Sequence, residues 1–241
     1  RSVGALGNAA TNISFPLSIS CVAIALLFGI GGASAFNIAM GMGEKENAVN
    51  YLANSAAMLF LGGVALTAVT LVFLEPLLKF FGSPDNVLEY AKVYTRIVAL
   101  GFPFLIFTSG GGHLIRADGR PKISMVCNLA GALINTVLDA LFVFVLNMGM
   151  AGAAYATIIG QIVSGLMAAW YLAHCRTIKI KKENLRVRRK YISRVMSLGT
   201  APCANQLAMM VVQIVMNKSL KYYGSLSVSV SYTHLTLPTI R

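Results

Sequence analysis

The chain has 241 residues, of which 56% are hydrophobic and 12% are charged, and its mean hydropathy is +0.70. Soluble domains carry about 25% charged residues, so this composition excludes a soluble globular protein and indicates an integral membrane protein. The net charge of +12 is concentrated in residues 174–194, which hold nine Lys or Arg, one acidic residue and no ladder of aromatic residues. Such a segment beside apolar spans indicates membrane orientation and contact with anionic lipids, rather than nucleic-acid binding.

Six apolar segments follow one another along the chain, each of roughly 17–27 residues. A helix of about 20 apolar residues is long enough to cross a hydrocarbon core about 30 Å thick. Gly and Ala occur throughout these segments, as in packed transmembrane helices, whereas a transmembrane β-barrel would show shorter, alternating strands. We therefore predict an all-α, polytopic membrane bundle with spans at residues 13–39, 52–74, 97–114, 123–146, 152–173 and 200–216.

The charges between these segments predict which ends face the cytoplasm. Arg116, Arg120 and Lys122 lie in the third connection, and the strongly basic segment forms the fifth. Odd-numbered connections share one side of the membrane, and an excess of Lys and Arg marks the cytoplasmic side. The second connection is charge-balanced and the fourth is uncharged, so both are placed outside. The loop at 174–199 is therefore predicted to be cytoplasmic.

Cysteine and histidine residues give no sign of a disulfide or metal framework. The four cysteines lie far apart without a CxxC pair, and the three histidines show no ligand spacing. Cysteines in or near apolar segments are expected to be small core residues. No metal and no other cofactor is expected, and no nucleophile–base pair in the sequence points to an enzyme.

Asp139 is the only carboxylate between residues 123 and 173, and it follows Asn135 by one helical turn. A charged carboxylate near the middle of a membrane helix costs about 2.5–3.5 kcal/mol on insertion scales, so it is retained where it faces a polar cavity. Residues i and i+4 share a helix face, which points this amide and carboxylate the same way. The pair indicates a site for a proton, a metal cation or a cationic substrate. The alternative is a hydrogen bond between helices without a transport role.

Four stretches of the chain carry recognisable motifs. The first, at 29–48, reads GIGGASAFNIAMGMGEKENA, and the second, at 114–122, reads LIRADGRPK. The third, at 135–144, reads NTVLDALFVF, and the fourth, at 149–157, reads GMAGAAYAT and is followed by Gln161. In this order they resemble the second helix with its loop, the loop between helices four and five, helix five, and the start of helix six of the multidrug and toxic compound extrusion (MATE) transporters.

The resemblance covers about residues 1–229 and implies that the six spans are helices two to seven of a twelve-helix, two-lobe transporter. It divides the chain into an N-terminal lobe without its first helix (1–174), a basic cytoplasmic linker between lobes (175–199) and the first helix of the C-terminal lobe (200–229). The last residues, 230–241, resemble the translation of a transposon-derived adapter used in sequencing libraries. We expect this tail to be a sequencing artefact, the alternative being a genuine polar tail.

The resemblance also implies a polar site inside the N-terminal lobe. In the family, an aspartate and an asparagine of helix five meet a threonine of helix six, and by motif position these are Asp139, Asn135 and Thr157. Gln161 and Gln206 are further candidate polar residues of that cavity. A helix-one aspartate that usually completes the site is expected to precede this chain. A proline that often follows the helix-five aspartate is absent, which puts a bend there in doubt, and the helix-seven glutamate of some members has no counterpart.

These features predict a cation-coupled antiporter, driven by protons or sodium, that exports amphipathic and often cationic compounds through the plasma membrane as a monomer. Its expected partners are drug-like molecules and membrane lipids, with anionic lipid near residues 176–194. A flippase for lipid-linked saccharides is the first alternative, but its cavity would need Arg or Lys, and the first five spans contain neither. A membrane-embedded enzyme and a purely structural membrane protein are the remaining alternatives.

Overall fold

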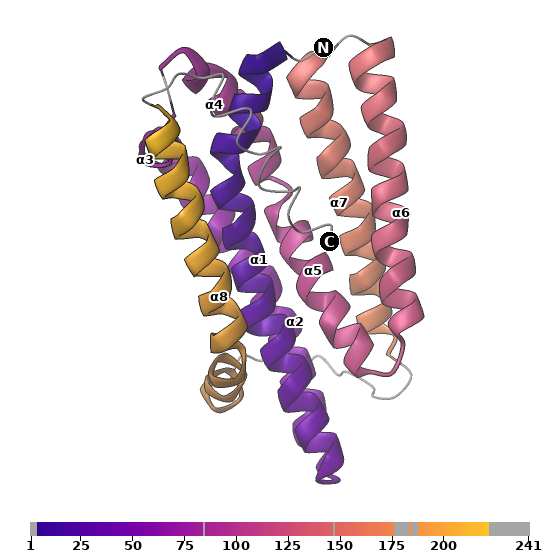
Figure 1. Cartoon of the computed structure of the whole chain (residues 1–241). Helices are drawn as coiled ribbons and strands as arrows, with labels where there is room; N and C mark the ends of the chain where they lie inside the picture. The colour runs from indigo at the N-terminus through magenta and orange to yellow at the C-terminus, as the bar shows by residue number, and fades with distance from the viewer. Residues whose placement is uncertain (1–3, 84, 147, 176–183, 185–187, 222–241) are drawn as a thin grey trace, which may run out of the picture.

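In the computed structural model, every regular element among the described residues is a helix (Figure 1). The structure describes residues 4–83, 85–146, 148–175, 184 and 188–221, so the tail at 230–241 and most of the basic segment lie outside the described residues. The elements, in chain order, are α1 (Gly4–Gly41), α2 (Lys45–Val72), α3 (Leu74–Phe80), α4 (Asp85–Ala99), α5 (Phe102–Ala117), α6 (Pro121–Ala140), η1 (Leu141–Val145), α7 (Gly149–Ala173) and α8 (Arg189–Lys221).

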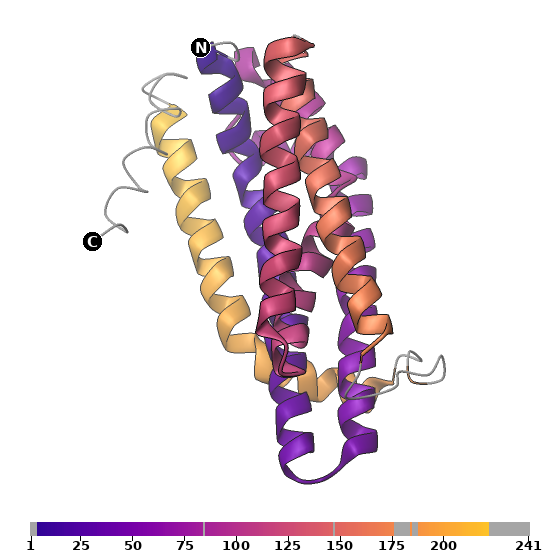
Figure 2. The same ribbon diagram turned by 90° about the vertical axis from the view of Figure 1, so that its right-hand side faces the viewer.

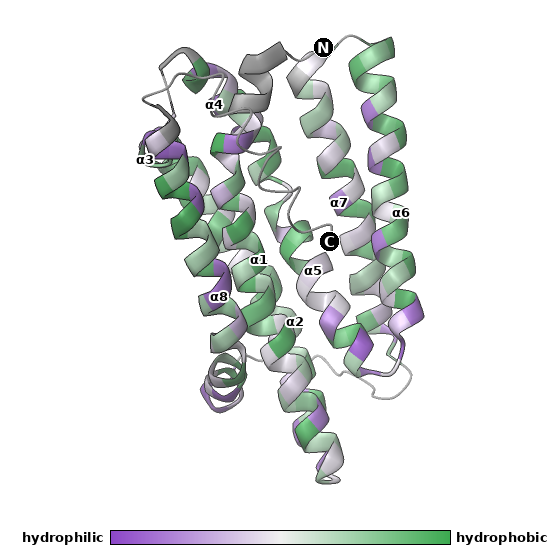
Figure 3. Ribbon diagram, viewed as in Figure 1, coloured by the Kyte–Doolittle hydropathy of each residue, from purple (hydrophilic) through white to green (hydrophobic). Residues whose placement is uncertain are grey.

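The long helices run up and down side by side, and the α1–α2 and α5–α6 connections lie at the same, lower end (Figures 1 and 2). Apolar residues follow the helices along their length, and hydrophilic residues gather at the lower ends of α5 and α6 (Figure 3). Five described helices are long and apolar enough to cross a membrane, and the bent pair of α4 and α5 makes a sixth span if it is counted as one. The predicted all-α membrane bundle is confirmed.

The third predicted span, 97–114, is not a continuous helix. α4 ends at Ala99, α5 begins at Phe102, and the two helices meet at an angle of 56°. Pro103 lies in the first turn of α5, where its missing N–H costs nothing because no intrahelical partner exists there. Inside one continuous helix, Pro103 could not donate to the Ala99 carbonyl and its ring would clash with that group, so the chain breaks here rather than continuing α4.

The helix that carries Asp139 changes its geometry directly after that residue. α6 ends at Ala140 and continues as one π-helical stretch, η1, from Leu141 to Val145. Proline is therefore not needed for an irregularity at this point, although its absence had put a bend in doubt. Short π-helical insertions of this kind are frequent at functional sites.

α8 begins at Arg189, earlier than the predicted span at 200–216, and its first turns cross the lower end of the bundle before the helix turns upward (Figure 2). The helix contains Pro202, which removes a backbone donor and favours a bend. α8 packs closely against α1 near this bend, since a Cβ atom on Gly199 would lie 2.7 Å from the carbonyl carbon of Leu27 on α1.

Glycines let other helix pairs approach just as closely. A Cβ atom on Gly29 of α1 would lie 2.6 Å from the Cα of Gly110 on α5. On α2, a Cβ atom at Gly63 would lie 2.5 Å from the Cα of Pro103. Real Cβ contacts are longer than these, so only glycine permits such backbone contact between α5 and its two neighbours.

A set of asparagines on α2 binds the chain ahead of α8. The Asn54 amide donates to the Asn184 carbonyl oxygen (3.2 Å), and its Oδ1 accepts from the Arg188 backbone N–H (2.8 Å). The Asn184 amide donates to Oδ1 of Asn50 (2.9 Å), whose own amide donates to the Tyr191 hydroxyl (3.2 Å). Because Asn50 and Asn54 are buried, these hydrogen bonds fix the start of α8 against α2.

We expect Asn54→Ala to lower stability by about 1–3 kcal/mol, because it removes the hydrogen bonds from buried Asn54 to the Asn184 carbonyl and from the Arg188 N–H, each worth about 0.5–1.5 kcal/mol. The measurement is the thermal unfolding midpoint of the purified protein, together with the rate of trypsin cleavage within residues 176–194. Cleavage should become faster in this variant. Asn205→Ala, at an exposed position on α8, is the matched control and should change neither quantity. An unchanged midpoint and cleavage rate in Asn54→Ala would contradict the anchoring role.

Candidate functional site

A polar groove of about 280 Å³ lies between α5, α6 and α7. Its walls combine small residues with hydroxyl and amide side chains, and no charged residue is among those that line it. The lining residues are Leu105, Thr108, Ser109, Asn128, Gly131, Ala132, Asn135, Thr157, Gly160, Gln161 and Ser164.

Helical spacing explains why these polar side chains meet. Thr157, Gln161 and Ser164 follow one another at intervals of four and three on α7, so they share one face. Asn128 and Asn135 are separated by seven residues, two turns of α6, and face the same space. Asn128 and Ser164 were not among the predicted site residues, although their helical spacing within apolar spans was a signal for both.

Two predicted site residues are in direct contact across the groove. The Asn135 amide donates to the Thr157 hydroxyl at 3.4 Å, and that hydroxyl in turn donates to the Ala153 carbonyl oxygen at 2.8 Å. The hydroxyl proton is therefore engaged with the backbone, and its oxygen is free to accept from the amide. This arrangement fixes the orientation of both side chains and leaves the Asn135 carbonyl oxygen available to a ligand.

Asp139 lies one turn beyond Asn135, at the end of α6, and is not among the residues that line the groove. Its Oδ1 atom is buried and has no hydrogen-bond partner among the described residues. Asp139 also interacts electrostatically with Tyr94 of α4. A buried carboxylate oxygen without a donor can bind a proton or a cation, since either one compensates the lost hydration. That role for Asp139 stays a prediction.

The two glutamines proposed for the cavity lie in different places. Gln161 lines the groove, and its Oε1 is buried without a hydrogen-bond partner among the described residues. Thr108 and Ser164, on the same walls, also carry buried hydroxyls that lack a described partner. The structure does not bring Gln206 to this groove, because it lies on α8, which packs mainly against α1. Thr108 and Ser109 of α5 join the site only through tertiary packing, and no spacing in the sequence indicated them.

The MatE family model matches residues 2–141 of the chain. The multidrug export protein MepA of Staphylococcus haemolyticus (strain JCSC1435) is 24% identical over 223 residues, which make up 91% of this chain and 49% of MepA. The chain thus spans about half the length of this curated relative.

Solved structures show the same arrangement of helices. An inward-facing multidrug resistance MATE family transporter of the MOP superfamily matches with a TM-score of 0.87 at 27% identity, covering 95% of this chain and 53% of that one. The MATE multidrug transporter DinF-BH matches with a TM-score of 0.89 at 30% identity, covering 97% of this chain and 53% of that one.

Contact between α6 and α7 at a glycine is expected to be essential for the groove. A Cβ atom on Gly160 would lie 2.7 Å from the Gly131 carbonyl oxygen and 3.0 Å from the Asn135 Cβ, so Gly160→Ala must push the helices apart. Overpacking of this kind costs about 1–3 kcal/mol, which a lowered thermal unfolding midpoint would report. Gly111→Ala makes the same change where the nearest atom is 3.6 Å away, and it should leave the midpoint unchanged. Equal midpoints for the two variants would contradict the close contact.

Proposed function

The chain belongs to the MatE family, and on that premise we propose that it is part of a multidrug efflux transporter that exchanges drugs for a proton or a sodium ion. The names of the matched proteins, a multidrug export protein and multidrug transporters, support the drug-export part of this proposal. In this proposal the chain supplies helices two to six of the N-terminal lobe and the first helix of the C-terminal lobe, and the basic linker joins them. The complete transporter works as a monomer.

One observation carries the ion-coupling part. The buried Oδ1 of Asp139 lacks a described partner and lies one turn from the hydrogen-bonded pair of Asn135 and Thr157. Together these side chains offer carboxylate, amide and hydroxyl oxygens to a small cation, or a carboxylate to a proton. The ion does work only if it binds the two lobe conformations with different affinity. One charge that moves inward across the membrane supplies about 2.3 kcal/mol per 100 mV.

The exported substrate is an amphipathic compound, often a cation. A groove with hydroxyl and amide groups among apolar walls binds drug-like molecules without demanding one shape. When the ion leaves Asp139, the bare carboxylate attracts a cationic drug, and when the ion returns, this attraction is lost. A flippase for lipid-linked saccharides needs cations to hold phosphate, and none of the residues that line the groove is Arg or Lys.

The lower end of the bundle in Figure 1 faces the cytoplasm. Arg116, Arg120 and Lys122 surround the α5–α6 connection there, and the start of α8 adds Arg188, Arg189, Lys190 and Arg194. An excess of basic residues in short connections marks the cytoplasmic side. Anionic lipids of the plasma membrane bind the basic segment at 176–194.

Asp139→Asn should abolish drug efflux driven by an ion gradient in the complete transporter, because the amide cannot exchange a proton or balance a cation. The loss of transport is measured as efflux of a fluorescent cationic dye from energised cells. The expression level and dye binding by the purified protein are measured alongside. Expression should stay near that of the unchanged protein, whereas the purified variant should bind the cationic dye more weakly, because the neutral amide no longer attracts it.

Glu89→Gln is the control for Asp139→Asn, because it removes an exposed carboxylate on α4 with the same chemistry. It should pump normally. If Asp139→Asn pumps as well as Glu89→Gln, Asp139 is a packing residue and the coupling role is wrong.

Labelling of single cysteines tests the orientation. A cysteine in place of Glu44, in the exposed α1–α2 connection, should escape a membrane-impermeant thiol reagent added to intact cells. A cysteine in place of Met148, at the start of α7, should react. The four native cysteines are first replaced by serine or alanine, and permeabilised cells show that both probes are reactive. The reverse pattern would invert the topology.

A further inference from the structure

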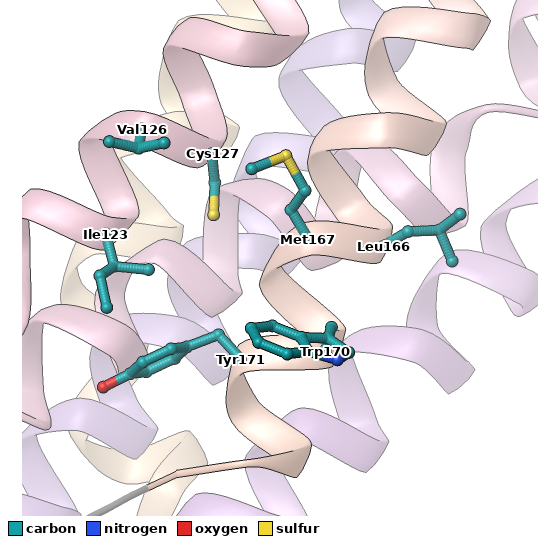
Figure 4. Close-up of a pocket in the computed structure, with 7 residues that line it drawn as sticks. All are labelled: Ile123, Val126, Cys127, Leu166, Met167, Trp170 and Tyr171. Atoms are coloured by element: carbon teal, nitrogen blue, oxygen red, sulfur yellow. The ribbon is translucent and has the colours of Figure 1, made fainter.

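A second groove, of about 410 Å³, runs between the lower halves of α6 and α7 and is separate from the polar one (Figure 4). Its size is within the range of small-molecule pockets, but its lining carries almost no polar surface. The lining residues are Ile123, Val126, Cys127, Leu166, Met167, Trp170 and Tyr171. Nothing in the proposed efflux mechanism uses this groove.

The groove opens away from the core of the bundle. Cys127 and Tyr171 form its floor and are 3% and 8% exposed, whereas Trp170 and Leu166 on its rim are 67% and 56% exposed. Both helices are long and apolar enough to span the membrane. The outward side of such a helix pair meets lipid, so an acyl chain is the molecule available to fill the groove.

The floor of the groove is held in one position. The Tyr171 hydroxyl donates to Oδ2 of Asp118 at 2.7 Å, which ties α7 to the connection between α5 and α6. Asp118 is 7% exposed and is not among the residues that line the groove, so this hydrogen bond is buried behind the floor residue Tyr171. The groove is therefore a preformed feature, and binding in it does not have to order these helices.

Two basic side chains lie at the lower end of the groove. Ile123, the first lining residue in chain order, directly follows the exposed Lys122, and Arg120 acts electrostatically on the Tyr171 hydroxyl. Among the described residues, neither cation forms an ion pair with a carboxylate. Trp170, whose ring lies 5.1 Å from that of His174, marks the level where aromatic residues meet lipid headgroups.

We propose that this groove binds one acyl chain of an anionic phospholipid, whose phosphate is held by Arg120 and Lys122. The apolar lining suits the chain, and the two cations at its end suit the headgroup phosphate. This site is distinct from the basic segment at 176–194, and it requires only that α6 and α7 cross the membrane. It does not depend on drug binding or on ion coupling.

Trp170 is the only tryptophan of the chain, so its fluorescence reports on the groove alone once any tryptophan outside residues 1–241 is replaced by phenylalanine. The complete protein is placed in phosphatidylcholine vesicles that contain rising fractions of dibrominated phosphatidylglycerol or dibrominated phosphatidylcholine. Bromine quenches tryptophan on contact. We expect half-maximal quenching at a several-fold lower fraction of the brominated phosphatidylglycerol.

The double variant Arg120→Gln, Lys122→Gln should make the two brominated lipids equally effective. The matched control, Lys181→Gln, Lys182→Gln, removes two cations from the basic segment and should keep the preference. Equal quenching by both lipids in the unchanged protein would show ordinary lipid contact only and overturn the proposal. A preference that survives the first variant, or that disappears in the control, would overturn it as well. Because no drug or gradient is present, failure here leaves the efflux proposal untouched.

Discussion

Helices in a membrane gain little by covering apolar surface, because lipid is as apolar as their side chains, so this bundle depends on how closely its backbones approach. Glycine permits that approach at Gly29 with Gly110, and at Gly131 with Gly160. The second contact matters most for function. Since α6 and α7 meet there without side chains between them, the Asn135 amide on one helix reaches the Thr157 hydroxyl on the other. A larger residue would move the two polar groups apart.

The same close packing leaves polar atoms of the site buried without partners, which favours binding of a ligand. Oxygen atoms of Thr108, Gln161 and Ser164 are shielded from solvent without a described hydrogen-bond partner, as is Oδ1 of Asp139. Unsatisfied buried polar atoms are costly, so a protein that keeps several in one region has them compensated by water, an ion or a ligand during its work. The proposed coupling requires that the compensating species bind the two conformations of the transporter with different affinity. The apolar groove on the outer side of α6 and α7 has the opposite character and suits lipid.

Much of this architecture could be predicted from the sequence, because apolar length alone identifies membrane spans. Asp139 and Asn135 were identified from their isolation and one-turn spacing, whereas Thr157 entered through the family resemblance. The break between Ala99 and Phe102 and the π-helical stretch after Ala140 depend on local backbone hydrogen bonding, which a hydropathy pattern does not report. The groove residues of α5 depend on which helices become neighbours, and that is decided by packing. Gln206 shows the converse, since a polar residue in a predicted span lies on a helix away from the groove.

We propose that ion and drug compete through Asp139, and thermodynamic linkage makes this competition measurable. The measurement is the dissociation constant of a fluorescent cationic drug for the purified complete transporter, determined over a range of pH and, separately, of sodium concentration. We expect the drug to bind more weakly as the concentration of one of these ions rises, and we expect Asp139→Asn to remove this dependence. A dissociation constant that is independent of both ions, or an ion dependence that survives in Asp139→Asn, would contradict it.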